Sequence, residues 1–97
     1  MYEVNPFTRI MDGWDERHWI KYQSTDGKGG FCLMGRMFMT SGNHTRLAET
    51  QMMVQDMLEA NYGVRAIPIW NDAEATTWDD VVAVLEKCEA KWAETHG

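Results

Sequence analysis

The stretch TTWDDVVAVLEKCEAKWAETHG, residues 76–97, has large apolar side chains spaced three or four positions apart. They are Trp78, Val81, Leu85, Cys88 and Trp92, and charged residues take the other side. This period is typical of an amphipathic helix with one buried face. The stretch therefore predicts a long helix that packs its apolar face into a shared core.

Four carboxylates lie at or just before the start of this helix, which raises the question of an active site; they are Asp72, Glu74, Asp79 and Asp80. Thr77 and Asp80 have the spacing of a capping box, with Asp in place of the usual Glu. Asp79 and Asp80 also lie where the helix dipole favours negative charge. Helix initiation thus explains both aspartates without catalysis.

Three earlier segments also have helical patterns. In NHTRLAETQMMVQDMLEANYG (43–63), Leu47, Val54 and Leu58 form a stripe, with Asn43 or Thr45 as cap and Gly63 at the end. In FCLMGRMFMTSG (31–42), the stripe is Phe31, Met34 and Phe38, beside Leu33 and Met37. NPFTRIMDG (5–13) predicts a short helix capped by Asn5 and stopped at Gly13.

Two segments have the character of strands. RHWIKYQSTDGKGG (17–30) alternates polar and apolar residues before a glycine-rich turn. VRAIPIW (64–70) is short, and Pro68 restricts it to an edge or terminal strand. We therefore expect an α+β fold: a helix-dominated small single domain over residues 1–97, with three to four helices and a small two- or three-stranded β element.

Composition restricts the function. The 97 residues carry a net charge of −6, with five basic residues against one acid in 17–46 and seven acids against two lysines in 72–97. Overall acidity argues against general nucleic-acid binding. No apolar run approaches the roughly 18 to 20 residues of a membrane span, and no signal peptide is recognisable, so we expect a cytoplasmic protein.

A pocket formed by Cys32, Trp70 and Asp72 is the main chemical possibility. Asn71 and Asp72 follow the predicted strand end, where they form either an Asx-turn or, beside Trp70, the mouth of a pocket. Cys32 begins a predicted helix, whose dipole can lower a thiol pKa, but between Phe31 and Leu33 it is more typical of a core side chain.

Anion, metal and partner sites leave weaker signals. Lys28 and Arg36 flank the glycine turn and could hold an anion with backbone amides, or the basic region simply faces the acidic C-terminal helix. No metal-ligand spacing is present, and we expect no cofactor. Met39 and Met52 lie off the apolar stripes and would mark an interface if exposed together with a tryptophan.

The order of short motifs resembles a small domain family of unknown function found in actinobacteria and their phages. The shared pattern is Trp-x-Lys, a glycine turn, Cys-Leu-x-Gly, an aromatic residue with Asn-Asp, and Thr-x-x-Asp-Val. Here these positions are Trp19, Lys21, Gly30, Cys32, Leu33, Gly35, Trp70, Asn71, Asp72, Thr77, Asp80 and Val81. The resemblance implies an actinobacterial or phage origin and no particular activity.

A protein-binding module is therefore our expectation, with a host protein or a second copy of the chain as partner. A small-molecule binder or minor enzyme and a structural homodimer built on the last helix remain alternatives. No catalytic residue is assigned, and whether the protein is an enzyme stays open, with a non-enzymatic role favoured. The candidate binding residues are Trp19, Lys21, Cys32, Arg36, Trp70, Asn71 and Asp72.

Overall fold

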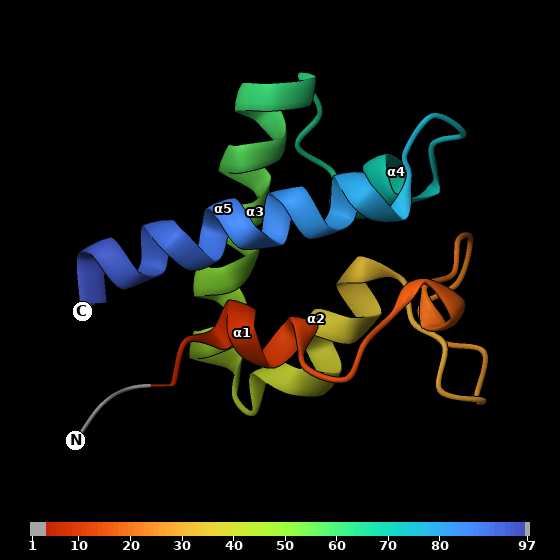
Figure 1. The fold of residues 1–97 in the computed structure, drawn as a ribbon, viewed down its shortest axis with the longest axis horizontal. Helices are drawn as coiled ribbons and strands as arrows, with labels where there is room; N and C mark the ends of the chain where they lie inside the picture. The colour runs from red at the N-terminus through yellow and green to blue at the C-terminus, as the bar shows by residue number, and fades with distance from the viewer. Residues whose placement is uncertain (1–3, 97) are drawn as a thin grey trace.

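The computed structural model describes residues 4–96, and these form helices joined by loops (Figure 1). The helices are α1 (Pro6–Met11), η1 (Glu16–His18, a 3₁₀ turn), α2 (Leu33–Ser41), α3 (His44–Tyr62), α4 (Ile67–Asp72) and α5 (Trp78–His96). In Figure 1 the two long helices, α3 and α5, cross each other, and α1 and α2 lie together on one side of α5.

One cluster of buried apolar side chains lies between these helices. Helices α1 and α3 pack against α5, and α2 packs against α1, α3 and α4. Leu33 and Met37 of α2, Val54 and Leu58 of α3, and Leu85 of α5 are fully enclosed. The stripes predicted for α3 and α5 do face this core, because each helix buries only one side.

The helix ends follow local rules that the sequence already showed. The Asn5 and Asn43 side chains accept hydrogen bonds from Phe7 N and Arg46 N, at 3.0 and 2.8 Å. Thr77 N donates to Asp80 Oδ2 at 2.9 Å, and Asp80 N donates to Thr77 Oγ1 at 3.3 Å. The predicted caps of α1, α3 and α5 are thus confirmed.

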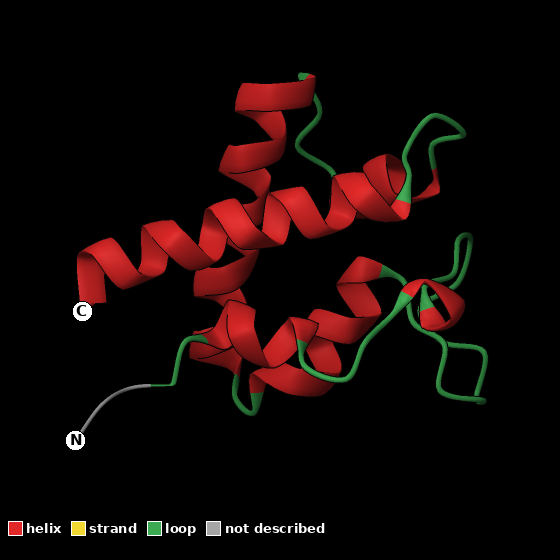
Figure 2. Ribbon diagram, in the orientation of Figure 1, coloured by secondary structure: helices red, strands yellow, loops and turns green. Residues whose placement is uncertain are grey.

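The α+β prediction is wrong. Figure 2 shows helix and loop only, and no strand occurs among residues 4–96. The segment predicted as a strand and turn keeps two isolated bridges, from Phe31 to Trp19 and to Thr25. A ladder does not form, because Tyr22 adopts a positive φ of 72° and turns the backbone out of an extended path.

The second predicted strand, VRAIPIW, is also wrong, since Ile67–Asp72 forms helix α4. Pro68 lies in the first turn of this helix, where a missing N–H breaks no intrahelical hydrogen bond. A short apolar run is compatible with a buried strand or a buried helix, and only tertiary contacts decide between them.

Helix α2 forms as predicted but presents a different face to the core. Leu33 and Met37 are buried, whereas Phe38, assigned to the core from sequence, is 60% exposed. Gly35 is buried as well, and a Cβ atom there would lie 2.1 Å from the Ser24 carbonyl oxygen. The loop backbone therefore packs directly against this turn of α2.

Gly35→Ala should destabilise the protein by about 1 to 3 kcal/mol, because backbone atoms must move to admit the methyl group. An alanine in place of a helical glycine ordinarily stabilises, so the sign of the effect is diagnostic. Urea unfolding followed by circular dichroism would measure it. Met39→Ala, on the exposed side of the same helix, is the control; equal or greater stability of Gly35→Ala would contradict the close contact.

The helices differ from membrane spans in their composition. Across residues 4–96, none combines the length and apolar character needed to cross a bilayer.

Candidate functional site

The predicted site residues meet around the buried side chain of Asn71, in the last turn of α4. Its Oδ1 accepts hydrogen bonds from Trp19 Nε1 at 2.7 Å and from Leu33 N at 3.0 Å. Its Nδ2 donates to Ile20 O and Asp72 Oδ1, both at 3.0 Å. The fully buried carboxamide therefore uses both donors and both acceptor positions within the chain.

Asp72 and Lys21 also bond the loop of residues 19–32 to α4, and we call this set of contacts the Asn71 joint. Asp72 Oδ1 accepts from Tyr22 N at 2.8 Å, which holds Tyr22 in its unusual conformation. Lys21 Nζ donates to Ala73 O at 2.6 Å and Thr76 O at 3.0 Å, beyond the C-terminal end of α4. These residues close a loop onto a helix, and the predicted Asx-turn at Asn71 and Asp72 is wrong because both belong to α4.

Cys32 and Trp70 belong to the interior beside this joint, with exposures of 5% and 3%. Cys32 is the N-cap of α2, and its Sγ accepts from Gly35 N at 3.3 Å. The Trp70 ring lies 5.3 Å from that of Tyr62. A pocket open to a ligand is therefore not what Cys32, Trp70 and Asp72 form.

Arg36 lies apart from the Asn71 joint, at the C-terminal end of α1. Its Nε donates to Ile10 O at 2.8 Å and its Nη2 to Asp12 O at 2.6 Å, with the guanidinium 5.8 Å from the Trp14 ring centre. Partial burial lowers the pKa of Arg36, although an arginine stays charged. Its donors serve carbonyls of the helix end rather than an external anion.

A groove that the sequence prediction missed lies between α2 and the segment that precedes it. It has a volume of about 340 Å³, and its walls are Ser24, Thr25, Phe31, Gly35, Phe38 and Met39. Phe38 and Met39 are 60% and 62% exposed. The sequence signal for this groove was Met39, which lies off the predicted apolar stripe. Phe38 gave no such signal, because the sequence analysis assigned it to the buried face of the helix.

Metal ligands do not gather anywhere in the described part of the chain: no three His, Cys, Asp or Glu side chains within residues 4–96 are placed to hold an ion. The predicted condition for a methionine interface is met only in part. Met39 and Met52 are exposed, but every tryptophan is buried or half-buried, and the exposed aromatic residues of 4–96 are Tyr22, Phe38 and Tyr62.

Comparison with protein families matches residues 12–91 to a family of unknown function, DUF6197. The chain belongs to DUF6197. The recognition of a family of unknown function is thus confirmed, while the actinobacterial or phage origin stays a prediction. Neither the curated proteins nor the solved structures include a match.

Several motif residues by which the sequence resembles a family stabilise the fold of this DUF6197 domain through hydrogen bonds and close packing. Trp19 and Asn71 bond to each other, and Gly35 admits the Ser24 backbone. Gly30 lies against Asp26, whose carboxylate accepts from Lys28 N and Gly30 N, and these bonds lower the pKa of Asp26. Family membership therefore identifies the scaffold and leaves the activity open.

Asn71→Ala should lower the free energy of unfolding by about 2 to 4 kcal/mol, because it leaves Trp19 Nε1, Leu33 N and Ile20 O without their partner. Asn61→Ala is the matched control, since Asn61 is exposed and bonds only within α3 and to Lys87. It should change stability by less than about 0.5 kcal/mol. Chemical denaturation would compare them, and equal effects would contradict the role of the Asn71 joint.

Cys88 should be unreactive in the native protein. It is fully buried in α5, and burial raises the pKa of its thiol to about 12. At pH 8 only about one thiol in ten thousand would be ionised, and only the thiolate reacts. In a Cys32→Ser variant Cys88 is the sole cysteine. Ellman's reagent should then label nothing until guanidinium is added; rapid native labelling would refute the prediction.

Proposed function

We propose that this protein is a protein-binding module that holds an apolar side chain of its partner in the groove on α2. The observation that carries the proposal is the pair Phe38 and Met39, two large apolar side chains that are both more than half exposed beside a groove of about 340 Å³. Neighbouring apolar side chains of this kind mark interaction surfaces more often than isolated ones do.

The lining of the groove favours binding over catalysis. Its six residues provide aromatic, thioether and hydroxyl groups but no acid, base or thiol. Covering Phe38 and Met39 would contribute about 2 to 3 kcal/mol through removal of apolar surface from water. The flexible Met39 side chain can adapt to an apolar group of varied shape.

The other functional predictions receive less support from the geometry. Cys32 and Trp70 are too deeply buried to face a ligand, and the apolar face of α5 is used within the chain, which leaves it unsuited to a dimer built on that helix. Within the proposal, the partner is a host protein met in the cytoplasm. The resemblance to a family of actinobacteria and their phages makes an actinobacterial lysate the first source to test.

Capture from such a lysate should depend on the groove. Immobilised wild-type protein and a Met52→Ser control should retain the same partner, because Met52 is equally exposed but lies on α3. A Phe38→Ser/Met39→Ser variant should retain at least tenfold less, as measured by quantitative mass spectrometry.

Equal retention by all three proteins would contradict the proposal. Sedimentation velocity at two concentrations would show whether the groove is instead occupied by a second copy, in which case the same double variant should abolish a concentration-dependent dimer.

A further inference from the structure

The apolar groove does not end at Met39. It shares Phe38 and Met39 with a second depression of about 520 Å³ at the corner between α2 and α3. That depression shares Ser41, Gly42 and Asn43 with a third, of about 280 Å³, which reaches α1. Three hollows that share wall residues thus follow one another around the corner, and we call this series the channel.

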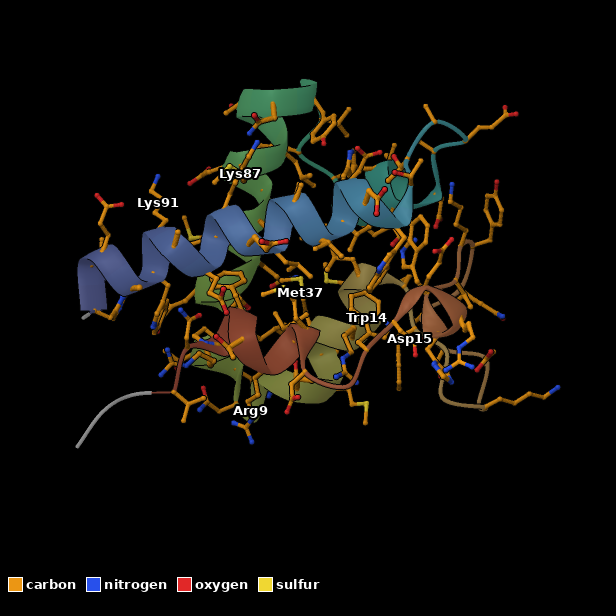
Figure 3. The ribbon with its side chains drawn as sticks, in the orientation of Figure 1. Arg9, Trp14, Asp15, Met37, Lys87 and Lys91 are labelled. Carbon is orange, nitrogen blue, oxygen red and sulfur yellow. The ribbon has the colours of Figure 1, made fainter. Side chains whose placement is uncertain are left out.

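The chemical character of the channel changes along its length. Its first part has the aromatic and methionine walls described above, whereas its last part includes Arg9 and Arg46. Arg9 is exposed, and Figure 3 shows its side chain pointing away from the core beneath α1. The channel therefore has an apolar end and a basic end.

Arg46 is the more constrained of the two arginines. Its guanidinium lies 4.6 Å from the Trp92 ring centre, and its Nη1 is 3.8 Å from Glu49 Oε2. Glu49 offsets part of its charge, so Arg9 provides the charge most available to a ligand. Arg46 forms part of the channel wall beside Arg9.

We infer that the channel binds an extended peptide segment of a partner protein, with a bulky apolar residue in the groove and an Asp or Glu side chain at Arg9. This inference rests on the proposed function and specifies the class of partner. A peptide suits a channel that is long and open, and the charge at its far end suits a carboxylate. The channel is less suited to a nucleic acid, because the whole chain carries a net charge of −6.

The geometry also sets the spacing within that peptide. From Gly35 to Gly42, α2 advances about 10 Å at roughly 1.5 Å per residue. An extended chain advances about 3.3 Å per residue, so this length corresponds to about three residues. With the further step from Gly42 to Arg9 on α1, we expect the acid about three to five positions from the apolar anchor. A wholly apolar ligand or an isolated carboxylate would fill only one end.

Selection from a phage library of random dodecapeptides on the immobilised full chain tests this directly. Enriched peptides should carry a bulky apolar residue and an Asp or Glu about three to five positions away. A synthetic peptide of the enriched sequence would then be titrated against variants by fluorescence anisotropy, after circular dichroism has shown that each variant is folded.

Arg9→Gln should lower the affinity for that peptide roughly threefold, as expected for loss of an exposed ion pair. Arg17→Gln removes the same charge from a side chain that is 84% exposed and that pairs with Asp15, outside the channel; it should have little effect. Raising the salt concentration should weaken binding to the wild type but much less to Arg9→Gln. Phe38→Ser should weaken binding at least tenfold.

The possible failures are distinguishable. Peptides that depend on Phe38 but show no acidic preference, with Arg9→Gln equal to Arg17→Gln, would overturn this inference and leave the proposed function standing. Peptides that bind Phe38→Ser as well as the wild type would overturn both. A Phe38-dependent dimer that no selected peptide displaces would identify a second copy as the occupant and also refute the inference.

Discussion

The arrangement of this domain depends on satisfying one buried amide. The Asn71 side chain has no access to water, and each of its polar atoms must find a partner inside the protein. The partners come from the loop before α2, from the first residue of α2 and from the neighbouring Asp72. The position of one side chain thus specifies where the loop lies and where α2 begins.

Other local features follow from that requirement. The loop must turn sharply after Ile20, and Tyr22 accepts a strained backbone conformation whose cost is offset by the bond from its N–H to Asp72. The returning backbone then reaches α2 at Ser24, where only a glycine leaves room. Side-chain bonds to α4 take the place that backbone pairing would have in a sheet.

The use of side-chain hydrogen bonds in place of backbone pairing explains which parts of the structure were predictable from sequence. The long helices and their caps depend on residues within a few positions of one another, such as Thr77 and Asp80 or Asn43 and Arg46, and periodicity located them correctly. The loop depends on Asn71, 52 residues from Trp19 and 38 from Leu33. Alternation around Trp19 resembled a strand because the local pattern contains no trace of so distant a partner.

The face of α2 was misjudged for the same reason, since Gly35 and Met37 are buried by contacts with other segments. The candidate site was affected by both errors: its polar residues proved to hydrogen-bond within the chain, and Phe38 proved to be exposed.

The location of the exposed groove relative to the motif residues has an evolutionary consequence. Phe38, Met39 and Arg9 lie outside the motif pattern by which the sequence resembles a family, whereas Asn71, Trp19 and Gly35 lie within it. Mutations at the first group leave the interior intact and so carry little penalty in stability. Under the proposed function, homologous domains could therefore differ in the partner that they bind while keeping the same interior, and the channel walls are the residues to compare between them.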